Sequence, residues 1–151
     1  MRIFMEKPQT TFSVRAALII KDDKFLTAKT TEYPLLYTTV GGGVEINETS
    51  EEAVVREVRE ELGVRLAVDR LAFVQERFFQ MGGQKYHEIV FFYLMQSCAA
   101  LDIPDGSCTD HEGETLHWLP LGRLNEFDLV PAFLRTASFS GTGIEHILSR
   151  E

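Results

Sequence analysis

Apolar and polar positions in the first third of the chain predict short strands separated by tight turns. A continuous apolar run over 14–20 ends at a charged turn, and the pattern resumes over 25–30, which predicts a hairpin. A further short strand is predicted over 37–40, and it leads directly into three consecutive glycines, 41–43. We expect these glycines to form a flexible loop whose backbone can approach a ligand closely.

The spacing of apolar residues changes from the alternation typical of strands to the spacing typical of a helix between residues 49 and 62. Thr49 followed by Glu52 predicts a capping box at the start of a helix, and Gly63 stands where a glycine commonly ends one. Val54 and Val58 fall on an apolar stripe that we expect to pack against a sheet.

The rest of the chain alternates strand formers with turn and loop residues. We predict strands over 64–68, 71–79, 86–96 and 115–119, a turn over 81–84, and short helices over 121–127 and 131–137. Mixed strands with one long internal helix predict an α/β (α+β) fold with layers of helices on a sheet. The length of 151 residues predicts a single domain over residues 1–151.

Charge and composition exclude several classes of function. The chain has 15 Lys+Arg against 23 Asp+Glu, a net charge of −8, so most of its surface repels a polyphosphate backbone and we expect no nucleic acid polymer as partner. A phosphate-bearing ligand would have to be small or bridged by cations. No run approaches the roughly 18 apolar residues of a membrane span, and no signal-peptide core precedes residue 13, so we expect a cytoplasmic protein with no membrane partner. Its two cysteines, Cys98 and Cys108, are then expected to be reduced.

Three glutamates on the predicted helix carry the candidate chemistry. Glu57, Glu60 and Glu61 are related by i+3 and i+4 spacing, which places like charges on one helical face. Either neighbouring arginines or a hard divalent cation must compensate this charge, and an all-oxygen ligand set suits Mg²⁺ or Mn²⁺ better than Zn²⁺. A solvated, salt-bridged helix face is the alternative explanation for the helix alone.

The glycine run and this helix together resemble the Nudix box, the signature of the Nudix hydrolase family. The matching pattern is Gly42, five residues, Glu48, seven residues, and then Arg56-Glu57-Val58-Arg59-Glu60-Glu61-Leu62-Gly63-Val64. Two positions depart from the usual pattern, because Val40 stands where proline is common and Asn47 where glycine is common. Neither position carries a ligand in the family.

The resemblance implies a Nudix-type α/β/α sandwich with a mixed β-sheet and a set of residue roles. Glu57 and Glu61 resemble the family's core metal ligands, Glu60 a ligand or water-orienting group, and Glu57 also the candidate general base. Arg56 resembles the residue that orients these glutamates, with Glu48 as its partner. The backbone carbonyl of Gly41 or Gly42 would complete the metal coordination.

Residues outside the box extend the candidate site. Glu112 resembles a position at which some family members add a carboxylate ligand or base, and a solvated loop acid is the equal alternative. Glu88 neighbours His87 on a predicted buried strand, so the two side chains face opposite ways, and we favour Glu88 as the residue that faces the site. Phe78 or Phe79 is a candidate platform for a base, with Phe79 preferred, and core packing is the simpler explanation. Arg77 is a candidate phosphate contact, and a surface salt bridge is the simpler explanation.

The sequence therefore predicts a Mg²⁺- or Mn²⁺-dependent enzyme that cleaves the pyrophosphate of a nucleoside diphosphate linked to another group. A nucleoside triphosphate and a nucleotide-sugar-type compound are both open as the small-molecule substrate. A non-catalytic nucleotide-binding regulatory module is the alternative function. The oligomeric state is open, and a homodimer is one of the alternatives.

Overall fold

The computed structural model describes residues 14–96 and 101–151. Its elements in chain order are β1 (Val14–Leu18), β2 (Ile20–Lys21), β3 (Lys24–Thr30), β4 (Val40–Gly43), α1 (Ser50–Leu62), β5 (Val68–Met81), β6 (Gln84–Met95), β7 (Glu114–Pro120), the 3₁₀ helices η1 (Leu121–Glu126) and η2 (Ala132–Arg135), and β8 (Glu145–Arg150). Cys98 lies outside the described residues.

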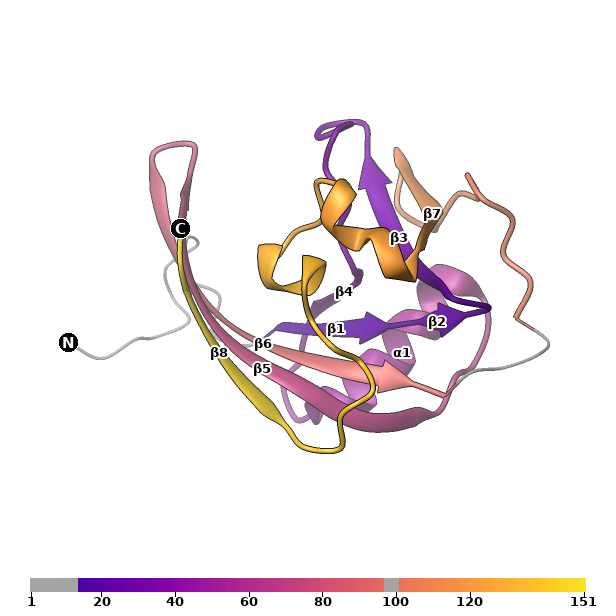
Figure 1. Cartoon of the computed structure of the whole chain (residues 1–151), viewed down its shortest axis with the longest axis horizontal. Coiled ribbons are helices and arrows are strands. Elements are labelled where there is room, and N and C mark those ends of the chain that lie inside the picture. The colour runs from indigo at the N-terminus through magenta and orange to yellow at the C-terminus, as the bar shows by residue number, and fades with distance from the viewer. Residues whose placement is uncertain (1–13, 97–100) are drawn as a thin grey trace.

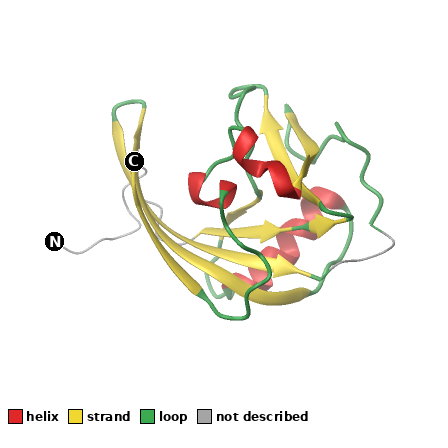
Figure 2. Cartoon of the chain, in the orientation of Figure 1, coloured by secondary structure: helices red, strands yellow, loops and turns green. Residues whose placement is uncertain are grey.

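The strands form one mixed sheet and one small antiparallel sheet (Figures 1 and 2). The five-stranded sheet has the order β4-β1-β6-β5-β8, in which β1–β6 and β5–β8 are parallel pairs and the others are antiparallel. The three-stranded sheet has the order β2-β3-β7. The predicted α+β fold with a mixed sheet is confirmed.

Two apolar layers hold the helices against opposite faces of the large sheet. Val54 and Val58 of α1 pack with Ala17 and Tyr93 in one buried cluster. The other cluster contains side chains of β1, β5 and β6 that point the opposite way, together with leucines from η1 and η2. Figure 1 shows α1 behind the sheet and η1 and η2 in front of it. The short helices predicted over 121–127 and 131–137 are both present as 3₁₀ helices, and the second covers only Ala132–Arg135.

The first predicted hairpin is only partly correct. The apolar run 14–20 divides at Ile19, so that β1 pairs with β4 and β6 while β2 pairs with β3. Asp22 and Asp23 have φ of 51° and 58°, which are the left-handed angles of a tight hairpin turn. One run thus serves two sheets, and its hydrophobicity does not show where the chain changes sheet.

One further predicted strand differs from the structure, and one observed strand was not predicted. The segment 64–67 is irregular, and β5 begins at Val68, although Leu66 is buried as an apolar prediction requires. The C-terminal strand β8 was not predicted. It lies at the sheet edge with Leu148 62% exposed, so backbone pairing with β5 holds it in place and no clear apolar alternation marks it.

The long predicted helix is confirmed at both ends. Thr49 is the N-cap and its Oγ1 accepts the Glu52 backbone N–H at 3.0 Å, while Gly63 has φ of 71° and ends the helix. The glycines before it, predicted as a flexible loop, instead form β4 and pair with β1. Within 14–96 and 101–151, no helix has the length and apolar character that crossing a bilayer requires.

Candidate active site

The helix α1 presents its glutamates at the border between its buried and exposed faces. Val54, Val58 and Glu61 follow one another at i, i+4 and i+7, so Glu61 continues the buried stripe and its side chain is only 3% exposed. Glu57 lies one turn before Glu61 on the same side and is mostly covered, whereas the Glu60 side chain is 46% exposed. The helix therefore separates two sheltered carboxylates from a third that faces outward.

Arg56 forms hydrogen bonds with several acidic side chains on and just before the helix. Its Nε and Nη2 donate to the two carboxylate oxygens of Glu48 at 2.7 and 2.9 Å, a bidentate pair, and its Nη1 donates to Glu57 at 3.0 Å and Glu60 at 3.3 Å. The hydrogen bonding of Arg56 to Glu48 raises the pKa of the guanidinium above its ordinary value. The guanidinium stays charged, and it fixes the direction in which Glu57 and Glu48 point.

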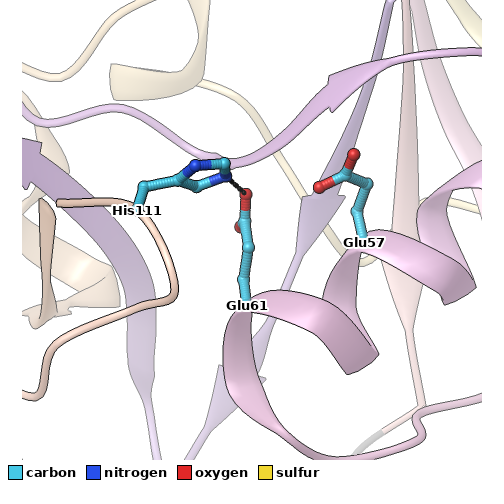
Figure 3. Close-up of side chains that lie close together, drawn as sticks. All are labelled: Glu57, Glu61 and His111. Carbon is cyan, nitrogen blue, oxygen red and sulfur yellow. Dashed lines mark ion pairs between the residues drawn. The ribbon is translucent and has the colours of Figure 1, made fainter.

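A histidine from a distant loop reaches the end of this acidic edge. His111 Nε2 lies 3.4 Å from Glu61 Oε1, and Figure 3 shows the imidazole directed at Glu61 while Glu57 projects from the preceding turn of α1. One donor atom from each of Glu57, Glu61 and His111 lies within 4.8 Å of the others. Three potential ligand atoms thus converge from two parts of the chain.

This donor set suits a divalent cation. Two carboxylates and one imidazole supply oxygen and nitrogen ligands. The carboxylates suit both Mg²⁺ and Mn²⁺, and Mn²⁺ also accepts the imidazole nitrogen. Glu61 is nearly buried, so its charge needs a compensating cation or proton donor close by. Among the described residues, the two helix glutamates and the loop histidine form the one group of three acidic or histidine side chains that lie close enough together to hold such an ion.

The remaining predicted metal residues lie around this cluster. Gly41 is on β4, which packs against α1, so its carbonyl belongs to the same edge of the sheet. Glu60 bonds to Arg56 and is not one of the three clustered groups. Glu112 lies exposed in the loop that carries His111, and the atom of this loop that reaches Glu61 belongs to the histidine. A ligand role for Glu60, Gly41 or Glu112 stays a prediction.

The predicted substrate residues are on the interior strands β5 and β6, and two of them face the side of the sheet opposite α1. Arg77 and Glu88 are cross-strand partners on β5 and β6, 3.8 Å apart between Nη1 and Oε2, and both line a cavity with Gly41 and Gly42. Burial raises the pKa of Glu88, against the opposing effect of Arg77. Phe79 is not among the residues that line this cavity. The Arg77 Cζ lies 4.0 Å from the centre of the Phe79 ring, and this ring stacks on Tyr86 with 4.8 Å between the ring centres.

Two residues of this region were missed by reasoning from the sequence. His111 carried no local signal, because only the packing of its loop against α1 brings it to Glu61. Gln75 lines the cavity and is fully buried. Its signal was available, since period-two alternation places it on the same face as Phe73, so that a polar side chain stands at a core position.

Comparisons with known proteins agree on one family. The NUDIX domain family model matches residues 11–137. The chain is similar to the CTP pyrophosphohydrolase of Escherichia coli strain K12, with 31% identity over 79% of this chain and 83% of that protein. It is also similar to the nucleoside triphosphatase NudI of Salmonella agona, with 30% identity over 82% of this chain and 92% of that protein.

Solved structures show the same fold. The E. coli ORF135 protein superposes with a TM-score of 0.55 at 27% identity, covering 83% of this chain and 85% of that chain. The MutT protein of Methanosarcina mazei Go1 superposes with a TM-score of 0.58 at 22% identity, covering 85% of this chain and 91% of that chain.

Proposed function

The chain belongs to the Nudix hydrolase family, and from this premise we propose that it is a Mg²⁺- or Mn²⁺-dependent pyrophosphohydrolase of free nucleoside triphosphates. The observation that carries the proposal is the convergence of donor atoms from Glu57, Glu61 and His111 beside the glycine strand β4. Between the two substrate classes that the sequence leaves open, the names of the E. coli and Salmonella relatives favour a triphosphate over a nucleotide sugar.

The metal-holding roles are assigned to Glu57, Glu61 and His111, with Glu60 and the Gly41 carbonyl as the adjacent groups. A divalent ion at these ligands would neutralise phosphate charge and lower the pKa of a bound water. The acidic edge of α1 would otherwise repel a triphosphate, so substrate binding and metal binding should depend on each other.

The protein's own groups then act on water and on orientation. Glu57 accepts the proton of the attacking water, whose oxygen forms a new bond to phosphorus while the bridging P–O bond breaks and the leaving phosphate takes the electron pair. Arg56 keeps Glu57 oriented through the 3.0 Å hydrogen bond from its Nη1 and is itself anchored by Glu48. Arg56 and Glu48 are thus positioning residues.

The test is hydrolysis of the common nucleoside triphosphates and of ADP-ribose by the purified full chain. Products are separated by anion-exchange chromatography with Mg²⁺, with Mn²⁺ and with a chelator. We expect triphosphate hydrolysis that the chelator abolishes, and reaction in ¹⁸O-labelled water identifies the phosphorus attacked. Hydrolysis that persists in chelator, or that is restricted to ADP-ribose, would contradict the proposal.

A further inference from the structure

The loop that carries His111 is a tight turn whose backbone closes on itself. Cys108 and Thr115 form an antiparallel bridge, and Thr115 belongs to β7, which pairs with β3. Within this bridge, the Thr109 N–H donates to the Glu114 carbonyl at 3.3 Å, and the Glu114 N–H donates to the His111 carbonyl at 3.2 Å. His111 therefore projects from the turn toward α1, with its side chain 60% exposed (Figure 3).

The hydroxyl of Thr109 holds the turn together from inside. The backbone N–H of His111 donates to Thr109 Oγ1 at 3.1 Å, and the Thr109 hydroxyl donates to Glu114 Oε1 at 2.9 Å. A threonine hydroxyl can donate once and accept at the same time, so one side chain makes both bonds. Linked hydrogen bonds of this kind strengthen one another. Thr109 thus fixes the backbone from which the imidazole of His111 projects.

The outer side of the turn rests on Thr31, the residue that follows β3. The Thr31 N–H donates to the Gly113 carbonyl at 2.9 Å. Gly113 has φ of 78°, and a Cβ at this position would lie 2.7 Å from Thr31 Oγ1. Only glycine permits this backbone angle and this close approach without strain. The turn is therefore docked on the chain beside β3 as well as closed internally.

The imidazole of His111 has only loose contacts at its far end, so its position depends on the backbone. Its Nε2 lies 3.4 Å from Glu61 Oε1 and 3.7 Å from Asp110 Oδ1, and both distances exceed the roughly 2.7–3.2 Å of an N–H···O hydrogen bond. A largely exposed side chain keeps its rotamer freedom, and ordering it on a ligand costs free energy. A fixed backbone at His111 reduces the freedom that is lost when the imidazole binds an ion.

We propose that Thr109 is a positioning residue for His111, and that its hydroxyl raises the affinity of the cluster of Glu57, Glu61 and His111 for Mn²⁺. Thr109 acts through the backbone of His111 and is not itself a ligand. The inference rests on the proposed function, from which it takes this cluster as the metal site, and it adds a residue that tunes the site. Groups that orient a metal ligand commonly change metal affinity by about 10- to 100-fold, and Thr109 supports one ligand of three, so we expect about three- to fivefold.

The test measures Mn²⁺ affinity of the full chain by electron paramagnetic resonance of the free ion, without nucleotide. Thr109→Val keeps the shape of the side chain and removes both hydrogen bonds, so Mn²⁺ binding should weaken by about three- to fivefold. Thr109→Ser keeps the hydroxyl and should restore wild-type affinity. Equal Mn²⁺ affinities of Thr109→Val and wild type would overturn the inference.

Thr115→Val is the matched control. It makes the same substitution just beyond the turn, where the Thr115 hydroxyl is hydrogen-bonded to His117 Nε2 at 2.8 Å and not to the turn. Its Mn²⁺ affinity should equal that of the wild type. A loss as large as that in Thr109→Val would show a general effect of losing a threonine hydroxyl and would overturn the assignment to Thr109.

A double-mutant cycle distinguishes positioning of His111 from a general effect on the fold. In the His111→Ala background the supported ligand is gone, so Thr109→Val should cause no further loss of Mn²⁺ affinity. A loss of the same size in both backgrounds would overturn the inference. Gly113→Ala, which forces the turn away from Thr31, is the second variant and should follow the same pattern if Thr109→Val does not fold.

The same measurements separate this inference from the proposed function. Mn²⁺ binding is read without nucleotide, so the cycle gives its result whether or not a triphosphate is hydrolysed. Unchanged Mn²⁺ affinity in His111→Ala would overturn the role of Thr109, while hydrolysis that the chelator abolishes would still support the proposed function. Hydrolysis that persists in chelator would overturn that function and leave a measured effect of Thr109 on Mn²⁺ binding in place.

Discussion

The acidic edge of α1 and the cavity behind β4 are built in opposite ways. Along the edge, one arginine contacts Glu48, Glu57 and Glu60, and most of the groups come from one short segment of the chain. The cavity gathers residues from four strands and from the segments 38–39 and 130–131. The first region is thus held together by charged contacts near the surface, while the second is a largely apolar space enclosed by distant parts of the chain.

Changes along the edge should therefore alter metal binding and turnover for all substrates alike, and changes in the cavity should alter what its buried groups contribute to stability. The first three predictions below test the edge, and the last tests the burial of Glu88 in the cavity, from the largest expected effect to the smallest.

Glu61→Gln should give the largest effect on turnover. The change removes one charge from the sheltered carboxylate that lies within reach of both Glu57 and His111. We expect metal-dependent kcat to fall by about 100-fold or more, equally for CTP and UTP, with nucleotide binding partly kept. The exposed Glu51→Gln on the same helix is the control, and unchanged turnover in Glu61→Gln would refute its assignment as a ligand.

Arg56→Lys should have a smaller but still large effect. Lysine keeps the positive charge and loses the planar fork that holds both oxygens of Glu48 and reaches Glu57. We expect a loss of about 10- to 100-fold in kcat and weaker Mn²⁺ binding, measured by electron paramagnetic resonance of the free ion. Normal Mn²⁺ affinity in this variant would contradict a positioning role.

His111→Ala should affect the choice of metal more than the rate with saturating metal. An imidazole ligand favours Mn²⁺ over Mg²⁺, so its loss should weaken Mn²⁺ binding by about tenfold and change Mg²⁺ binding less. His111→Glu, which restores a charged oxygen ligand, should recover Mg²⁺ binding. Titration of both metals into each variant is the measurement, and identical affinities in all three proteins would remove His111 from the ligand set.

Glu88→Gln should change the pH dependence of stability, with the smallest effect on turnover. Burial raises the folded-state pKa of Glu88 above its ordinary 4.5, while Arg77 opposes and Glu151 adds to this shift. The stability due to the neutral form is complete below the unfolded-state pKa and is lost as pH rises through the folded-state pKa. Urea unfolding should therefore show the wild type losing stability relative to Glu88→Gln as pH rises from about 4.

The control for that measurement is Glu32→Gln, which alters an exposed glutamate in a turn. Its unfolding free energy relative to wild type should not follow the trend expected for Glu88→Gln. A flat difference between wild type and Glu88→Gln would show that Glu88 is not desolvated in the folded protein.

Local sequence determined the helix and the acidic groups on it. The capping pair Thr49 and Glu52, the stripe through Val54 and Val58, and the stop at Gly63 are interactions between residues a few positions apart, so they could be inferred without a fold. For the same reason, Glu57, Glu60 and Glu61 could be placed on one helical face from i+3 and i+4 spacing, whereas the role of Arg56 came from the resemblance to the Nudix box.

Only the tertiary structure decided what completes that edge and what lies behind it. His111 is brought to Glu61 by the packing of a loop, the run 14–20 is divided between two sheets, and β8 is held by backbone pairing with β5. Strand alternation places Gln75 on the same face as Phe73, but only its neighbours in the folded chain show that its side chain is fully buried there. These features depend on contacts between distant parts of the chain, and spacing along a sequence does not specify which distant residues will meet.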